Sequence, residues 1–303
     1  LFSTLRGYRK EYLPKDIFSG IIIAAVSIPI SMGYAQISGI PAVHGLYGSV
    51  LPILLFALFS TSRQFIFGVD AAPAAIVGGA LSTLGIAAES EAAMDYVPAI
   101  ALFAGLWLFI FFLLHADKIV DFISTPVMGG FISGIAVTII LMQIPKLMGS
   151  PAGSGELLEL AEHIFAAAKN ISWLSLFMGL ALVLIRTFKK LAPKFPMAIV
   201  IMALGVLSTV VFHVDEKGVV LLQSVERGLP SLVILDFGNV DLTQAAGRGL
   251  MVAVVIMAET LLAENTFAFR NDYKLNDRQE ILACAAGNIV AGNIQPFQCF
   301  TAT

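Results

Sequence analysis

Long apolar stretches, separated by short polar ones, recur along most of the chain. A helix that crosses a lipid bilayer needs about 20 mostly apolar residues in succession. Nine segments approach this pattern, and they cover residues 17–34, 45–59, 73–84, 97–115, 128–146, 171–186, 196–213, 249–269 and 280–294. The second and third are short for a full crossing. The pattern predicts an all-α polytopic membrane protein.

Basic side chains set the expected orientation, because cytoplasmic loops of membrane proteins are enriched in Lys and Arg. Residues 1–16 carry Arg6, Arg9, Lys10 and Lys15, and we expect them to form a cytoplasmic N-terminal segment. Nine crossings then leave thirteen of the 18 basic residues on the cytoplasmic side. The first apolar stretch is too long for a signal peptide, so we expect it to remain as a span. The sequence therefore predicts a multi-pass protein of the cell membrane.

The composition agrees with this class and argues against several others. Apolar residues make up 58% of the chain and charged residues 13%, against about 25% charged in soluble domains. The mean hydropathy is +0.88. A net charge of −3 with scattered basic residues argues against nucleic acid as a partner. Cys284 and Cys299 cannot build a disulfide framework, and no spacing suits a metal site or a catalytic nucleophile–base pair. We expect neither an enzyme nor a cofactor.

The third segment is too short to be an ordinary span. About twelve residues of helix extend roughly 18 Å, whereas the hydrocarbon layer is about 30 Å thick. Asp70 precedes Ala71 and Ala72, and Pro73 lies where the first turn of a helix tolerates proline. We predict a half-helix, covering residues 73–84, that begins inside the membrane after an extended lead-in. A shortened or tilted ordinary helix is the alternative.

A half-helix that begins inside the membrane has a chemical consequence. Its first N–H groups lack partners within the helix, and its N-terminus carries a partial positive charge of about +0.5. Such an end binds anions without any cationic side chain. Residues 70–72 are therefore the first candidates for an anion site.

Glu259 lies in an apolar run, residues 252–263, with no basic residue within a helical turn. An isolated carboxylate at that depth costs about 2.5–3.5 kcal/mol. The residue must be protonated, paired or turned toward a polar cavity, and we favour a cavity or proton carriage over a packing role. Thr260 either lines the same cavity or bonds its own helix. Glu264, nearer the cytoplasmic end, is interpreted as structural.

Two segments between the spans are also of interest. Apolar and acidic residues alternate over residues 154–170 with the spacing of a short amphipathic helix at the membrane interface. Residues 214–246 form a mixed loop, which we place on the extracytoplasmic side. For both segments a plain connection is the favoured interpretation, and the amphipathic helix is the alternative for residues 154–170.

Motifs spread over almost the whole chain point to one family. They are Pro29, Tyr34-Ala35, Pro41 and Gly45-Leu46-Tyr47, the stretch 122–149, Gly228-Leu229-Pro230, Glu259-Thr260, and Asn276 to Glu280 followed by Gly287-Asn288. They resemble the SulP anion permeases, the sulfate permease family that includes the mammalian SLC26 transporters. The stretch 122–149 is the most specific of these matches.

The resemblance implies fourteen membrane segments in two inverted seven-helix repeats, divided into a core and a gate domain and assembled as a homodimer. The core would hold spans 1–4 in residues 17–115 and spans 8 and 9 in residues 247–303. The gate would hold spans 5–7 in residues 116–213. The last residues, QPFQCFTAT, resemble the strand that leads into half-helix 10. We therefore expect a longer transporter, truncated here after about the ninth segment, and a cytoplasmic STAS domain commonly follows in the family.

The resemblance also implies a site between half-helices 3 and 10. Tyr34 would be the aromatic residue that faces the site, residues 70–72 the start of the half-helix, and Glu259 the residue for cation coupling. With Thr260 these are the expected substrate contacts. Two positions depart from the family: Ile30 stands where many animal members have Gln, and Asp70 places a carboxylate beside the anion. Asp70 would either repel substrate or cap the half-helix.

These observations predict secondary active transport of a small anion, with the core moving against the gate. Sulfate, bicarbonate and dicarboxylates all remain candidates, and a proton is favoured over sodium as the coupling ion. A passive anion channel or a voltage-responsive membrane protein on the same scaffold is the alternative. Permeases for nucleobases share this fold, but the motifs count against that substrate class.

Overall fold

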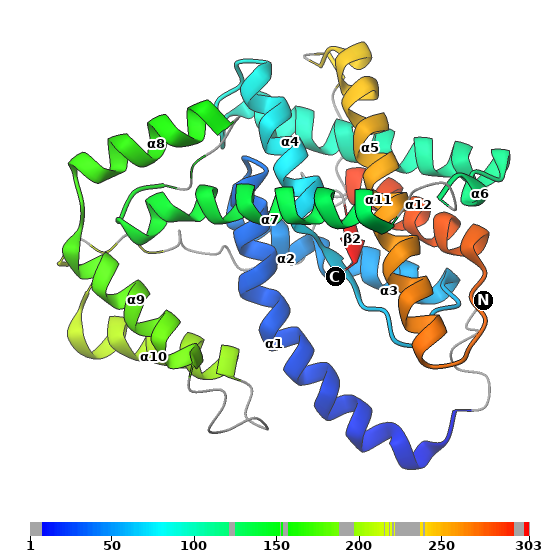
Figure 1. The fold of residues 1–303 in the computed structure, drawn as a ribbon, viewed down its shortest axis with the longest axis horizontal. Helices are drawn as coiled ribbons and strands as arrows, with labels where there is room; N and C mark the ends of the chain where they lie inside the picture. The colour runs from blue at the N-terminus through cyan, green and yellow to red at the C-terminus, as the bar shows by residue number, and fades with distance from the viewer. Residues whose placement is uncertain are drawn as a thin grey trace.

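A computed structural model describes residues 8–120, 125–151, 153, 157–187, 197–214, 216–217, 219, 221, 237–238, 240–293 and 300–302. Within these residues the protein is helical, apart from loops and two strands of three residues each (Figure 1). The Gly228-Leu229-Pro230 motif and residues 294–299 lie outside the described residues, as does most of the loop 214–246.

The elements follow one another in a simple order. The first half of the chain contains η2 (Lys10–Tyr12), α1 (Leu13–Ile37), α2 (Ala42–Gly48), α3 (Leu51–Phe59), β1 (Phe67–Val69), α4 (Ala71–Thr83), α5 (Glu91–Leu114) and α6 (Asp117–Val120). The second half contains α7 (Thr125–Leu147), α8 (Leu157–Lys169), α9 (Trp173–Thr187), α10 (Met197–Phe212), α11 (Leu242–Arg270), α12 (Asp277–Asn293) and β2 (Phe300–Ala302). Each of the nine predicted segments coincides with a helix, except the second, which is divided into α2 and α3.

Helix length and apolarity decide which helices could cross a membrane by themselves. Among the residues that the structure describes, four stretches are long and apolar enough to cross a membrane: Lys10–Ile37, Ala42–Phe59, Glu91–Leu114 and Leu242–Arg270. Helices α8 and α9 meet at a bend of 113° and would add a fifth crossing if they were counted as one span. Helix α8 is therefore a separate short helix, so the favoured interpretation of residues 154–170 as a plain connection is wrong and the alternative, a short helix, is observed. Leu158 and Phe165 on it are 81% and 71% exposed.

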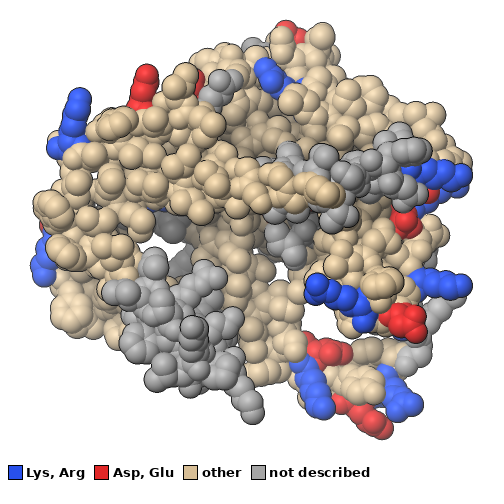
Figure 2. Space-filling model, in the orientation of Figure 1, with Lys and Arg blue, Asp and Glu red and all other residues tan. Residues whose placement is uncertain are grey.

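The surface is that of a membrane protein. Figure 2 shows a face dominated by uncharged residues, with Lys, Arg, Asp and Glu gathered toward its margins. Large apolar side chains are exposed on several helices, among them Phe18 on α1, Leu54 on α3 and Phe212 on α10. Lipid tails are the solvent in which such side chains are stable. Together with its long apolar helices, this surface makes the chain a multi-pass membrane protein.

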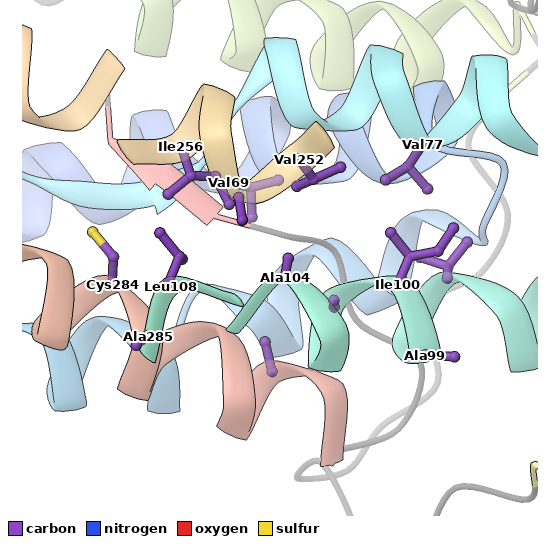
Figure 3. Packing of buried hydrophobic residues seen from close by; sticks show 14 of the residues in the cluster. Val69, Val77, Ala99, Ile100, Ala104, Leu108, Val252, Ile256, Cys284 and Ala285 are labelled. Carbon is purple, nitrogen blue, oxygen red and sulfur yellow. The ribbon is translucent and has the colours of Figure 1, made fainter. Parts of the chain in front are cut away.

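The tightest packing lies where α5 meets α11 and α12, and α12 also packs against α3 (Figure 3). Small residues let the backbones approach closely, as is common where membrane helices meet. A Cβ at Gly105 of α5 would lie 2.6 Å from the backbone nitrogen of Ile289 on α12. A Cβ at Gly249 of α11 would lie 2.7 Å from the Cβ of Phe103. Glycine is therefore required at both contacts.

The two strands bring the end of the described chain to its first half. Strand β1 pairs with β2 in antiparallel register, with Phe67 opposite Ala302, Gly68 opposite Thr301 and Val69 opposite Phe300. Strand β2 also contacts α11 and α12. The predicted extended lead-in to the third segment is thus observed as β1, and the strand expected near the end of the sequence is observed as β2.

Candidate functional site

Helix α4 begins where strand β1 ends. Asp70 is its N-cap residue, with extended backbone angles (φ −118°, ψ 155°), and the helix runs for 13 residues. At 1.5 Å per residue this is about 20 Å, too short to cross the hydrocarbon layer. Ala72 and Ala74 in the first turn are no more than 2% exposed. The helix therefore begins in the interior of the protein, preceded by a strand, as the half-helix prediction requires.

The side chain of Asp70 does not cap α4. No backbone N–H of the helix donates to its carboxyl, although Asp70 occupies the N-cap position. Instead, the carboxyl makes a side-chain hydrogen bond with Glu259 of α11. The capping interpretation of Asp70 is therefore wrong, because the side chain is turned toward α11 and leaves the first N–H groups of α4 to other acceptors.

Glu259 belongs to a different part of the chain, and packing brings it to this point. Figure 3 shows Val69 of β1 beside Val252 and Ile256 of α11, which lie about two turns and one turn before Glu259, respectively. The carboxyl of Glu259 meets that of Asp70, and its Oε2 is buried with no hydrogen-bond partner in the described part of the chain. Two carboxyl groups can hydrogen-bond only if one of them carries a proton. The contact between the two carboxyl groups is therefore suited to holding one proton.

Tyr34 of α1 joins the same group. Its side chain is half-buried, and the phenol lies close enough to Asp70 to interact electrostatically. The structure thus brings together Tyr34, Asp70 and Glu259, with Ala71 and Ala72 at the start of α4. These residues belong to α1, to the start of α4 and to α11, which are far apart in the sequence. No local sequence pattern could therefore show that they meet.

Thr260 makes a different contact. Its side chain is 1% exposed, and the Sγ of Cys284 on α12 lies 3.9 Å from its Oγ1. The hydroxyl is therefore engaged at the α11–α12 contact. Its role as a substrate contact stays a prediction.

Two further polar residues lie near the site, and the sequence analysis selected neither of them as a site residue. Lys146 of α7 donates a hydrogen bond from Nζ to Oε1 of Gln36 on α1, at 2.7 Å. Both side chains are half-buried. Gln36 is two residues from Tyr34, so this bond places a cation close to the same helix turn. The signal was weak, because Lys146 stands at the end of an apolar stretch, where a basic residue is ordinary.

A cavity of about 280 Å³ opens between α3 and β1. Ser60, Ser62, Arg63 and Phe67 line it together with apolar residues of α3 and of the turn that follows it. None of the candidate residues named above lines this cavity, so it is separate from the group around Asp70.

Comparison with known proteins gives a consistent result. A family model described as "Sulfate permease family" matches residues 13–303. A probable sulfate transporter of Mycobacterium tuberculosis is 25% identical over 288 residues, which is 95% of this chain and 51% of that protein. The chain thus spans about half the length of this curated relative.

Two solved structures share the fold. One is the transmembrane domain of a cyanobacterial bicarbonate transporter, BicA, with a TM-score of 0.85, 18% identity, and coverage of 98% of this chain and 76% of that one. The other is the murine solute carrier 26 family member A9 anion transporter in the inward-facing state, with a TM-score of 0.84 and 17% identity. That match covers 99% of this chain and 53% of the murine one. The all-helical membrane fold is therefore confirmed.

Proposed function

Because the chain belongs to the sulfate permease family, we propose that it forms part of a secondary active transporter for a small anion. One observation carries the proposal: helix α4 begins in the protein interior, and the side chain of its N-cap residue does not accept from the first N–H groups of the helix. Such an end combines free donors with a partial positive charge, and both favour an anion. A family made up of transporters also points away from an enzyme.

The proposed substrate is a small oxyanion, with sulfate, bicarbonate and dicarboxylates as the candidates. The relatives named above are described as transporters of sulfate and of bicarbonate. We place the anion at Ala71 and Ala72, with Tyr34 beside it and Thr260 as a further predicted contact. Asp70 and Glu259 lie next to this position, so the charge on their carboxyl pair influences how tightly the anion binds.

We assign the coupling ion to the pair formed by Asp70 and Glu259. A proton on the pair removes a negative charge that would otherwise repel the anion. It also makes the inward movement of a monovalent anion electrically neutral, which avoids about 2.3 kcal/mol per 100 mV of inside-negative potential. The hydrogen bond between the carboxyl groups favours a proton over sodium, because a bound sodium ion would separate them.

The proposed transport cycle moves one group of helices against another. The predicted gate, residues 116–213, contains α6 to α10, and the predicted core contains α1 to α5 together with α11 and α12. The bond from Lys146 to Gln36 joins α7 to α1 and so lies between the two groups. We propose that the whole protein works as a homodimer in the cell membrane, with the N-terminus in the cytoplasm.

The test uses the full-length protein reconstituted in liposomes. Uptake of labelled sulfate, bicarbonate and fumarate is measured with and without an inward proton gradient. We expect one anion to accumulate above its equilibrium level when the gradient is present. Movement of every anion only down its own gradient, independent of pH, would instead favour the passive channel.

A further inference from the structure

A second group of acidic side chains lies beyond the proposed anion site. Glu264 on α11 and Glu280 on α12 are both 0% exposed. They meet near the turn that connects α3 to β1. The structural interpretation of Glu264 as a residue near a membrane surface does not anticipate this complete burial. Buried carboxyl groups require partners or a proton.

Glu280 has its partners within the protein. The Oγ of Ser60 donates to its Oε2 at 2.6 Å, and the backbone N–H of Thr61 donates to its Oε1 at 2.6 Å. The hydroxyl of Thr61 donates to the same Oε1. Three donors converge on one carboxyl, which is the environment of an ionised carboxylate.

Glu264 has none of these partners. Both of its carboxyl oxygens are buried, and neither accepts from a donor group among the residues that the structure describes. The carboxyl of Glu280 is close enough to share a hydrogen bond with it if one of the two is protonated. The groups that face it from α12 are the carboxyls of Glu280 and Asp277 and the thiol of Cys284. A second negative charge here would therefore add repulsion to the cost of burial.

The basic residues nearby are turned elsewhere. Arg278 of α12 donates from Nε to the backbone oxygen of Phe112 and lies 4.6 Å above the ring of that residue. Arg270 and Lys118 are exposed or partly exposed at the ends of α11 and α6. Neither contributes a hydrogen bond to Glu264 within the described ranges.

The remaining elements that pack against α11 add no compensating charge. Helix α4 and strand β2 have no titratable side chain in their sequences, and α6 contributes Asp117 beside Lys118. Most titratable residues of α5 lie at its far end, where the hydroxyl of Tyr96 accepts from the N–H of Asp241 at the start of α11. On α11 itself, Glu259 is already hydrogen-bonded to Asp70.

We propose that Glu264 binds a proton beside the carboxylate of Glu280, which makes these two residues a second proton site, separate from Asp70 and Glu259. The ligand is a proton from solvent, which converts the Glu264 carboxylate to the neutral acid, and no other bond changes. The site joins α11, α12 and the turn before β1, since Glu280 also holds Ser60 and Thr61. Loss of the proton would place two carboxylates together and loosen this junction. The proposal does not depend on transport.

Infrared spectroscopy of the full-length protein in lipid tests the proposal directly. A protonated carboxyl gives a C=O stretching band that an ionised one lacks. We expect Glu264→Gln to remove the intensity of one buried acid at neutral pH. Glu162→Gln is the matched control, because it removes the same group from an exposed position on α8. An unchanged band in Glu264→Gln would overturn the proposal.

Two further measurements keep the test decisive. Glu280→Gln should shift the frequency of the Glu264 band, because its neighbour changes from a carboxylate to an amide, and an unshifted band would contradict the pairing. This second variant also serves if Glu264→Gln fails to fold. If the Glu264 band disappeared when sodium was added at constant pH, the site would bind a metal cation in place of the proton. That result would overturn the assignment. Neither measurement requires anion transport, so failure of the transport test leaves this result interpretable.

Discussion

Single residues at the proposed site act through pairs rather than alone. Asp70 by itself would be an unfavourable neighbour for an anion, and Glu259 by itself would be an unfavourable charge in an apolar helix. Their hydrogen bond changes both roles, since the pair needs a proton and its charge depends on that proton. The sequence supplied both residues as candidates, but it did not show that they touch.

Glu259→Gln tests the coupling role of this pair. The amide of Gln can still donate a hydrogen bond to Asp70, so the local structure should be retained. It cannot release a proton in the transport cycle. We therefore expect the variant to keep anion exchange in liposomes and to lose accumulation driven by a proton gradient, while Glu162→Gln on exposed α8 keeps both. Unchanged pH dependence of uptake in Glu259→Gln would contradict the coupling assignment.

Asp70→Asn tests the electrostatic role of the other member. Removing a negative charge beside the N-terminus of α4 should strengthen anion binding by about 1 kcal/mol, or roughly fivefold in Kd. Titration calorimetry with sulfate measures the change. Asp272→Asn is the control, since it removes the same charge at an exposed position in the turn after α11. Weaker binding in Asp70→Asn would mean that the carboxyl itself assists the anion.

At the scale of elements, the decisive feature is the close contact of α5 with α11 and α12. These helices are joined through Gly and Ala, and the small side chains allow contacts that larger ones would prevent. This packing fixes the rotation of α11 and so decides which of its faces meets β1. Glu259 reaches Asp70 because of that rotation, while Thr260 next to it reaches Cys284.

Gly105→Ala tests the contact between α5 and α12. The added Cβ would lie 2.6 Å from the nitrogen of Ile289, so the two helix backbones must move apart. We expect the free energy of unfolding in detergent to fall by about 1–3 kcal/mol. Gly247→Ala on α11 is the control, because nothing lies within 4 Å of its Cβ. That variant should be stabilised by up to about 1 kcal/mol, and equal effects in the two variants would argue against the close contact.

At the scale of the whole molecule, strand pairing joins distant parts of the chain. Strand β2 lies beside β1 and contacts α11 and α12, so it adjoins the start of α4 from the opposite end of the sequence. The fold is shared with two solved anion transporters at TM-scores of 0.84 and 0.85. The orientation of the protein in the membrane also belongs to this scale. Each crossing reverses the side of the next loop, so the side of any one loop depends on every crossing before it.

Cysteine accessibility tests the proposed orientation. In a background with Cys284→Ser and Cys299→Ser, we introduce Lys15→Cys in the first turn of α1 and Glu91→Cys at the start of α5, both at exposed positions. A thiol reagent that cannot cross membranes should label Glu91→Cys in intact cells and should label Lys15→Cys only after lysis. The reverse labelling pattern would show that the N-terminus faces the outside of the cell and would contradict the proposed orientation.

The sequence by itself determined the class of the protein, the position of each long helix and the short third segment. It could do so because hydrophobicity, helical spacing and helix length are local properties that successive residues carry on their own. The extended segment before α4 was predicted for the same reason. The spacing of α8 was also visible in the sequence, but a plain connection was favoured there. The start of the short helix and the apolar surroundings of an acid singled out Asp70 and Glu259, and the family resemblance added Tyr34.

Only the tertiary structure decided which side chains meet. The hydrogen bond between Asp70 and Glu259, the pairing of β1 with β2, and the burial of Glu264 beside Glu280 all join residues from different elements. Each depends on how far a helix is rotated and how closely its neighbours approach, and these are set by packing over the whole molecule. A glutamate looks the same in the sequence whether its carboxyl faces water, a hydroxyl or another carboxyl. Its chemistry follows from that neighbour, which only the folded chain provides.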